Sequence, residues 1–236
     1  MASTGPADAP SKRGAFIVLE GLDRSGKTTQ VKLLEQRFVE AGRPVTMMRF
    51  PDRSTTIGQM IDAYLKSNVE MDDHVIHLLF SANRWEAAKK INELLASGKT
   101  VVSDRYFHSG IVYSAAKNNP SLSLSWARAP ERGLPRPDMV VFLDLTPEEA
   151  SRRGGWGGEV YERAEMQKRV RELFRGLGGV EEEGDKVEGG VERDEDVVVV
   201  DAGGGVEEVA ERIWGVVEER VGEVDRGEVG DVRTVE

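Results

Sequence analysis

The sequence predicts an α/β fold, in which a five-stranded parallel sheet is covered by helices on both faces. Short apolar runs alternate along the chain with longer amphipathic segments, which is the pattern of successive strand–helix–strand units. A glycine-rich stretch follows the first apolar run directly, as at a tight turn from a strand into a helix. The 236 residues are enough for one such domain with a full hydrophobic core.

The first half of the chain is expected to begin with a strand at about 15–20, followed by a helix from Gly26 that ends at Gly42. Val31, Leu34, Phe38 and Ala41 share one face of this helix. Further strands are expected at 45–50 and 100–104, and further helices at 57–66, 72–97 and 107–116. The long helix 72–97 is predicted to bury a single apolar face, made of Val75, Leu78, Leu79, Ala82, Trp85, Ala88, Ile91 and Leu95.

The second half is expected to continue with a polar, proline-containing loop at 118–137 and a strand at 139–145. Thr146-Pro147-Glu148-Glu149 is a capping box with proline at the first helical position, so a helix begins there and breaks at 154–158. A helix at 161–173, a strand at 197–200 and a last amphipathic helix from Val206 follow. We expect a Glu/Gly-rich solvated insertion at about 180–196, and an acidic, frayed tail at 222–236.

The net charge of -10 is unevenly distributed: residues 1–179 hold 26 Lys and Arg against 22 Asp and Glu, whereas residues 180–236 hold 6 against 20. The acidity therefore does not argue against an anionic ligand in the first three quarters. No basic stripe with interleaved aromatic residues occurs, so we expect no nucleic-acid partner. The absence of cysteine excludes disulfides and thiolate chemistry.

The N-terminal segment 1–13 has no apolar core and is expected to be a disordered lead-in rather than a secretory signal. The longest apolar runs, 16–19 and 139–143, have the length of strands, so no membrane association is expected. We expect one domain at 14–221, located in the cytoplasm, with the nucleus as a second compartment.

The segment Gly21–Thr28 fits the pattern G-x-x-x-x-G-K-[ST] at every fixed position. It lies between the strand at 15–20 and a helix, which is the context of a nucleotide phosphate site. The glycines let the backbone approach phosphate oxygens, and loop amides at the helix N-terminus carry partial positive charge. In such a loop Lys27 reaches the β- and γ-phosphates and the Thr28 hydroxyl binds Mg²⁺. Arg24, inside the loop, can neutralise charge on the transferred group.

Four further segments carry residue types suited to phosphate or base binding, although each alone also has an ordinary structural explanation. Arg53, in 50–54, offers a planar fork for a second phosphate, or is a surface residue of a turn. Phe80 and Arg84 share a helix face. Phe80 can stack on a base while Arg84 donates to the carbonyl of that base. Alternatively, Phe80 is a core residue and Arg84 is a solvated surface residue.

Asp104 and Arg105 stand at the C-terminal end of the third strand. An acid there can hold Mg²⁺ and an arginine can bind phosphate, or the two residues simply pair with each other. Arg152 and Arg153 stand beside a glycine-rich break at 154–158. They suit a mobile lid over the nucleotide, or an ordinary loop between helices.

Together, segments 21–28, 50–55, 77–86 and 104–106 resemble thymidylate kinase, of the eukaryotic type that carries arginine in the phosphate loop. The resemblance covers about 13–176 and then 197–218. It implies a P-loop kinase fold with a small lid at about 152–160, a homodimer, and transfer of the γ-phosphoryl group of MgATP to dTMP in dTTP biosynthesis. Where the family's lid edge usually reads Glu-Arg-Tyr-Glu, this chain has Val160 in place of the arginine.

The resemblance also implies a set of site residues. The donor ATP is expected to contact Gly21, Asp23, Arg24, Ser25, Gly26, Lys27, Thr28 and Thr29. The acceptor dTMP is expected to contact Asp23, Phe50, Arg53, Phe80, Arg84, Arg105, Tyr106, Gly110 and Tyr161. Catalysis is assigned to Arg24, Lys27, Asp104 and Arg153, and Mg²⁺ to Thr28 and Asp104.

Within dTMP, Arg53 and Arg105 are expected at the phosphate, Phe80 and Arg84 at thymine, and Tyr161 at the deoxyribose.

The residues alone leave other functions open. A deoxynucleoside kinase would need a carboxylate base and no clamp for an acceptor phosphate, and other nucleoside monophosphate kinases differ in the base they accept. A nucleotide-dependent switch or a degenerate binding module would show no dependence on an acceptor, and the guanine-reading Asn-Lys-x-Asp of GTPases is absent.

Overall fold

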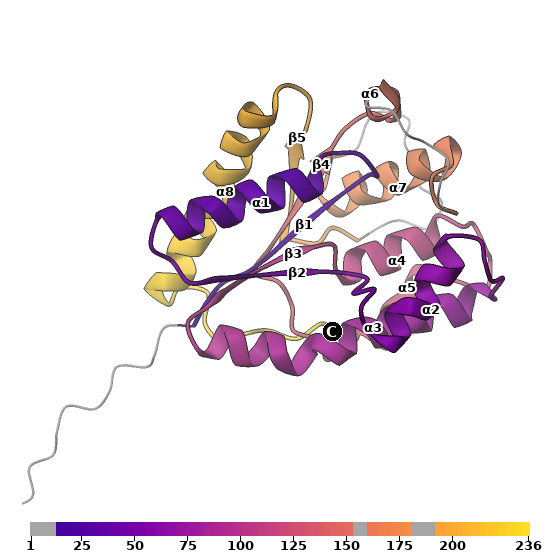
Figure 1. The fold of residues 1–236 in the computed structure, drawn as a ribbon, viewed down its shortest axis with the longest axis horizontal. Coiled ribbons are helices and arrows are strands. Elements are labelled where there is room, and N and C mark those ends of the chain that lie inside the picture. The colour runs from indigo at the N-terminus through magenta and orange to yellow at the C-terminus, as the bar shows by residue number, and fades with distance from the viewer. Residues whose placement is uncertain (1–12, 153–159, 181–191) are drawn as a thin grey trace, which may run out of the picture.

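The computed structural model describes residues 13–152, 160–180 and 192–236. Its centre is one five-stranded sheet with the order β2-β3-β1-β4-β5, in which every neighbouring pair is parallel (Figure 1). The sequence prediction of a five-stranded parallel sheet is confirmed. The strands are β1 (Phe16–Gly21), β2 (Val45–Arg49), β3 (Thr100–Asp104), β4 (Met139–Asp144) and β5 (Val197–Asp201).

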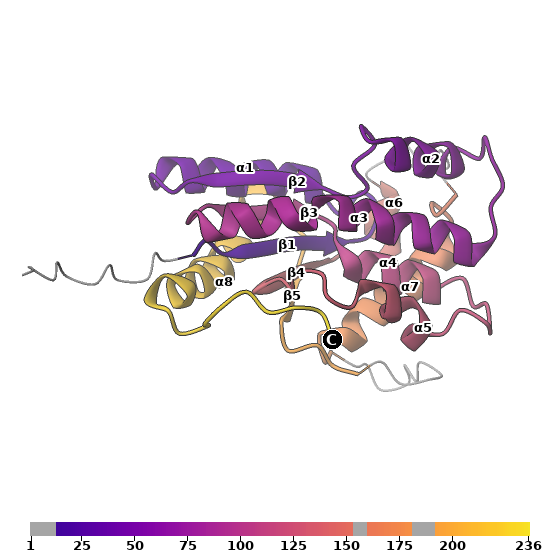
Figure 2. The same cartoon turned by 90° about the horizontal axis from the view of Figure 1, so that it is seen from below.

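Helices cover both faces of this sheet. Helices α1 and α8 lie on one face, and α3, α4 and α7 lie on the other (Figures 1 and 2). The described helices are α1 (Lys27–Glu40), α2 (Thr56–Leu65), α3 (Asp73–Ala96), α4 (Phe107–Ala115), α5 (Leu124–Arg128), α6 (Pro147–Arg152), α7 (Ala164–Leu177) and α8 (Val206–Arg226), with a 3-10 turn η1 (Ala129–Glu131). None of these helices is long and apolar enough to cross a membrane.

The central strand β1 shows why its sequence is apolar throughout. Phe16 and Val18 point into the core beneath α3, α4 and α7, whereas Ile17 and Leu19 point into the core beneath α1 and α8. Successive side chains of a strand face opposite ways, so a strand covered on both sides needs an unbroken apolar run. The carboxyl end of β1, where the phosphate loop begins, is thereby fixed at the middle of the sheet.

The predicted buried face of the long helix α3 is only partly correct. Ala88, Ile91 and Leu95 are buried, but Val75, Leu78 and Trp85 are 49%, 46% and 42% exposed. The N-terminal half of the helix instead buries polar side chains, namely His77, Ser81, Asn83 and Arg84. These polar side chains can be buried because each has a hydrogen-bond partner. The spacing of apolar residues along the sequence does not reveal such partners.

Two segments expected to be irregular are ordered. The loop 118–137 contains α5, capped by Ser123, whose hydroxyl accepts from the amide of Trp126 at 3.2 Å, and then η1. Helix α8 continues past Gly222 to Arg226, and Thr234 bridges to Pro135 with Val235 buried, so the predicted fraying of 222–236 is wrong (Figure 1). The apolar contact of Val235 outweighs the acidic composition of the tail.

Element boundaries differ elsewhere by a few residues. Helix α7 begins at Ala164 rather than at Tyr161, and Ala41 is an exposed residue at the end of α1 instead of part of its buried face. The capping box is confirmed: the Thr146 hydroxyl accepts from the amide of Glu149 at 3.2 Å, and the Glu149 carboxylate accepts from the amide of Thr146 at 3.1 Å. The predicted lid core at 153–159 with Arg153, the lead-in 1–12 and most of the insertion, 181–191, lie outside the described residues.

Candidate active site

The loop between β1 and α1 is shaped by its glycines. Gly26 has a φ of 91°, and a Cβ on Gly21 would lie 2.6 Å from the Ser25 hydroxyl, so both positions require glycine. Helix α1 starts at Lys27 with no acidic residue in its first turn and no side-chain cap. Its first amides therefore present partial positive charge to an anion.

Lys27 lies folded into this loop. Its Nζ donates to the carbonyl oxygens of Gly21 at 3.0 Å and Leu22 at 2.5 Å, and it lies 3.4 Å from the Ser25 hydroxyl. Burial, together with the nearby guanidinium of Arg105, lowers the pKa of Lys27 to about 8, although the neighbouring carboxylates oppose this shift. An anion bound in the loop would favour the protonated form of Lys27, because the ammonium group would then pair with a negative charge.

Thr28, in the first turn of α1, meets Asp104 at the end of β3. The Thr28 hydroxyl donates to Oδ2 of Asp104 at 3.0 Å, and the carboxylate is almost fully buried. Arg49, at the end of β2, lies 3.9 Å from the same oxygen. A hydroxyl beside a carboxylate at the edge of a phosphate loop is the hard-oxygen donor set that Mg²⁺ prefers.

Arg105 is held by a network of acidic groups. Its Nη2 donates to Asp23, its Nη1 donates to the Ser109 hydroxyl at 3.0 Å, and Glu20 lies 3.9 Å from Nη1. The guanidinium also lies over the Tyr113 ring, 5.1 Å from its centroid. Burial opposes ionisation of Asp23, but the charges of Arg105 and Lys27 prevail and hold its pKa below the usual value.

Glu20 and Gln167 support this network from behind. Glu20 is fully buried and accepts from the amides of Tyr106 and Ser109, both at 3.0 Å, which fixes the start of α4. Gln167, on α7, accepts from the amide of Asp23 at 3.1 Å and donates to its carboxylate at 3.0 Å. Backbone strain marks the same place, because Arg24 and Arg105 both have a φ of 67°.

A second basic group stands at the segment after β2. The Nη1 of Arg53 donates to Asp62 of α2 at 2.6 Å, and its side chain is partly exposed. The segment is pinned by Asn83, whose side chain accepts from the amide of Asp52 at 2.8 Å. A Cβ on Gly58 would lie 1.8 Å from the Asp52 carbonyl oxygen, so glycine there permits α2 to approach this segment.

The other end of the site contains an aromatic and a buried ion pair. Phe80 and Arg84 of α3 both face the cavity, and Arg84 forms a two-point salt bridge with Glu131 of η1. Gly110 lies against the guanidinium, since a Cβ there would be 2.5 Å from Nη2 of Arg84. This end therefore offers an apolar ring and hydrogen-bond donors held against a glycine.

Tyr113 and Tyr161 line another part of the cavity, and Tyr64 packs against Tyr161. The ring of Tyr161 lies 6.1 Å from that of Tyr64 and 5.4 Å from that of Tyr113, and the Nζ of Lys117 lies over the first two rings at about 5 Å. Burial raises the pKa of Tyr161, and the neighbouring hydroxyl of Tyr64 raises it further, so the phenol stays neutral. The carbonyl of Tyr161 accepts from Gln167 at 2.9 Å, which ties this part of the cavity to Asp23.

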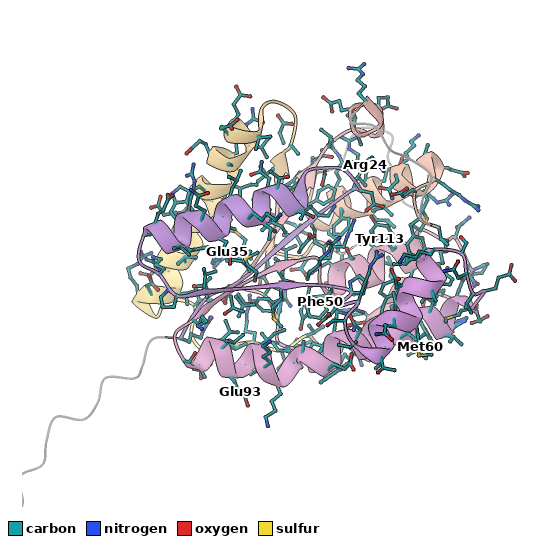
Figure 3. The ribbon with its side chains drawn as sticks, viewed as in Figure 1. Arg24, Glu35, Phe50, Met60, Glu93 and Tyr113 are labelled. Carbon is teal, nitrogen blue, oxygen red and sulfur yellow. The ribbon has the colours of Figure 1, made fainter. Side chains whose placement is uncertain are left out.

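These groups surround a single open cavity of about 340 Å³. Figure 3 shows Arg24, Phe50 and Tyr113, which come from three separate segments, around this region. The cavity brings together most of the residues predicted from the sequence, namely Asp23, Arg24, Gly26, Lys27, Thr28, Thr29, Phe50, Arg53, Phe80, Arg84, Asp104, Arg105, Tyr106, Gly110 and Tyr161. Gly21 and Ser25 lie just behind it as hydrogen-bond partners of Lys27, and Arg153 is outside the described residues.

Several residues at this site were not predicted from the sequence. Arg49, Tyr113 and Glu162 line the cavity, while Glu20, Glu131 and Gln167 hold its side chains from behind. A carboxylate that ends the apolar run of β1 was a usable signal for Glu20. No local signal marks Glu131 or Gln167, because their partners are 47 and 144 residues away in sequence.

Comparison with known proteins gives the family. The family model described as thymidylate kinase matches residues 19–213 of the chain. This chain belongs to the thymidylate kinase family. It is 46% identical over 215 residues to the thymidylate kinase of Arabidopsis thaliana, covering 91% of this chain and 75% of that protein. It is 50% identical to the thymidylate kinase of Schizosaccharomyces pombe, covering 70% of this chain and 77% of that protein.

The fold of this thymidylate kinase family member agrees with a solved relative. The structure of thymidylate kinase from Candida albicans superposes with a TM-score of 0.75 at 36% sequence identity, covering 90% of this chain and 94% of the other. The predicted P-loop kinase fold is thereby confirmed, and membership of the family makes the chain a nucleoside monophosphate kinase that uses ATP as donor.

Proposed function

We propose that the protein transfers the γ-phosphoryl group of MgATP to dTMP, giving ADP and dTDP, in dTTP biosynthesis. The observation that carries the proposal is the polarity of one cavity, with Lys27 and Arg105 at one end and Phe80 and Arg84 at the other. A ligand that fits must carry an anionic group at one end and a flat, carbonyl-bearing ring at the other. The relatives named above support thymidine monophosphate as that ligand.

The donor ATP is assigned to the phosphate loop. Lys27 would move its ammonium from the carbonyl oxygens of Gly21 and Leu22 to the β- and γ-phosphates, which the loop amides also bind. Thr28 and Asp104 fit Mg²⁺, because both offer hard oxygen atoms beside the phosphates. When bound, Mg²⁺ neutralises charge on the phosphates. Arg24 would neutralise charge on the transferred group.

The acceptor is assigned to the opposite side of the same cavity. Arg53 and Arg105 would bind the dTMP phosphate, Asp23 the sugar side, and Tyr161 the face of the deoxyribose that lacks a 2′-hydroxyl. Phe80 would stack on thymine, with Phe50, Tyr106 and Gly110 completing the wall around the base. The acceptor phosphate is already an anion, so catalysis needs alignment and charge neutralisation rather than a strong base.

Three expectations from the sequence belong to the same proposal. Arg153 and the segment 152–160 would close over the transferred group and exclude water. The protein would form a homodimer, which the exposed apolar side chains Met60, Val75 and Leu78 on α2 and α3 support. Sedimentation of the purified protein measures the mass of the oligomer, and we expect twice the 26.0 kDa of one chain. A cytoplasmic location, with the nucleus as second compartment, completes the proposal.

The KM for ATP is expected to rise by about twofold between pH 7 and 8, and more steeply above pH 8, approaching tenfold per pH unit. The pKa of Lys27 is lowered to about 8 before the nucleotide binds, while bound phosphates favour its protonated form. Above pH 8 the lysine must therefore take up a proton when ATP binds. Initial rates against ATP concentration between pH 7 and 9.5 measure this rise.

Lys27→Arg is the matched control for this pH dependence, because a guanidinium stays protonated over the whole range. The rise should vanish in this variant whatever its absolute activity. A wild-type KM for ATP that stays flat to pH 9.5 would contradict the assignment of Lys27 to the ATP phosphates.

The function is tested by ADP release from MgATP with one acceptor at a time: dTMP, dUMP, dCMP, dGMP, UMP, AMP or thymidine. Strong stimulation by dTMP, weaker by dUMP and little by UMP or thymidine is expected. Preference for thymidine would reassign the chain to the nucleoside kinases. Slow release that no acceptor stimulates would instead indicate a nucleotide-dependent switch or a binding module.

A further inference from the structure

Glu131 forms a buried ion pair with Arg84 behind the base end of the cavity. The Nε of Arg84 donates to Oε2 of Glu131 at 2.8 Å, and Nη2 donates to Oε1. The two side chains are 2% and 0% exposed. They come from α3 and η1, so a contact between distant segments fixes the plane of the guanidinium.

This geometry leaves one nitrogen of Arg84 for a ligand. Among the hydrogen bonds of the described residues, Nη1 makes none, whereas Nε and Nη2 are both engaged by Glu131. A Cβ on Gly110 would lie 3.0 Å from Nη1 and 2.5 Å from Nη2, so the guanidinium lies close against that glycine. Arg84 lines the cavity beside Phe80. Nη1 is therefore the nitrogen of Arg84 that remains available to donate to a base stacked on Phe80.

The pair also sets which chemical groups this corner accepts. A guanidinium donates hydrogen bonds and accepts none. The carboxylate of Glu131 is fully buried, with both oxygens engaged by Arg84, so a ligand does not reach these two acceptors. The pair is also neutral as a whole, whereas several further basic side chains line the rest of the cavity, namely Arg24, Lys27, Arg49, Arg53 and Arg105. A phosphate is drawn to these cationic side chains and a carbonyl to the neutral pair.

We propose that Glu131 is a positioning residue that orients and neutralises Arg84, so that the cavity selects pyrimidine monophosphates with a carbonyl at position 4 over those with an amino group. The inference rests on the proposed function, because it assigns the base specificity of the same site. Without Glu131, Arg84 would be a buried cation without its counter-charge, and its guanidinium plane would no longer be fixed by a two-point contact.

The test compares kcat and KM for dTMP and dCMP in the wild type and in Glu131→Gln. Glutamine has the same shape, but its amide N–H₂ would face a guanidinium N–H, so the two-point bond cannot form. We expect KM for dTMP to rise at least about tenfold, with the KM for ATP unchanged. The ratio of kcat/KM between dTMP and dCMP should fall at least about tenfold, because an oriented donor is what rejects the amino group.

Asp138→Asn is the matched structural control. Asp138 is also a buried carboxylate in a two-point pair with an arginine, Arg13, but it lies outside the cavity. Its substitution should reduce thermal stability to a similar degree and leave the ratio of dTMP to dCMP intact. If Glu131→Gln does not fold, Glu131→Asp takes its place. Aspartate keeps the negative charge, but its side chain is too short to make both hydrogen bonds to Arg84. An intermediate fall in the ratio of kcat/KM between dTMP and dCMP is therefore expected.

A double-mutant cycle separates positioning from stability. In the background of Arg84→Met, Glu131→Gln should cause no further loss of base discrimination, because the carboxylate acts through the guanidinium. A folded Glu131 variant that keeps the wild-type ratio would overturn the inference. A wild type that phosphorylates neither dTMP nor dCMP would instead overturn the proposed function, so the two failures are distinguishable.

Discussion

Replacing Arg24 by methionine is expected to lower kcat at least about a thousandfold, with KM for dTMP changed by no more than about threefold. Arg24 stands within the phosphate loop at a φ of 67° and lines the cavity, and its Nη2 lies 3.7 Å from the Glu162 carboxylate. A cation placed at the transferred group stabilises charge that develops in the transition state, so its loss lowers kcat rather than binding. Steady-state rates of dTDP formation measure the effect.

Arg37→Met is the control for this substitution. Arg37 lies on α1, the same helix that the phosphate loop enters, but pairs with Glu211 on the surface of α8. Its substitution should leave kcat within about twofold, because exposed ion pairs contribute little. An Arg24→Met enzyme that keeps a tenth of the wild-type kcat would show that the arginine acts outside the transition state.

Replacing Asp104 by asparagine is expected to lower kcat/KM for ATP at least about a hundredfold and to raise the Mg²⁺ concentration at half-maximal rate at least about tenfold. Asparagine can still accept the hydrogen bond from Thr28, so the local fold should persist. What it loses is the negative charge that attracts the cation. Rates at fixed ATP over a range of free Mg²⁺ measure the shift.

Asp201→Asn provides the matching control, because Asp201 also ends a strand of the same sheet but lies at β5, outside the cavity. This variant should follow the wild-type Mg²⁺ curve. If Asp104→Asn also follows it, Asp104 is not part of the metal site, and the hydrogen bond with Thr28 has only a structural role.

The sequence predicts well those parts of the site whose residues lie close together along the chain. The phosphate loop with Lys27 and Thr28 needs glycines and a lysine at fixed spacing, and Asp104 and Arg105 follow directly from a strand end. Each is specified by local backbone geometry, so the sequence order alone places it. The order of strands adds that β1 and β3 are neighbours, which brings Thr28 to Asp104.

The supporting residues could not be found in this way. Glu131 lies in a segment that looks like a loop, and its partner Arg84 lies on a helix whose apolar period points elsewhere. The prediction that Leu78 and Trp85 are buried failed for the same reason, since the helix turns its polar residues inward to build the site. A buried polar pair leaves no periodic signal in either segment.

The most direct measurement is the yield of dTDP per ADP released, with dTMP and with thymidine as acceptors at equal concentration. A cavity that holds two arginines for an acceptor phosphate should give one dTDP for each ADP with dTMP, and almost no dTMP from thymidine. Faster phosphorylation of thymidine, or ADP release that yields no dTDP, would contradict the assignment of Arg53 and Arg105 to the phosphate of dTMP.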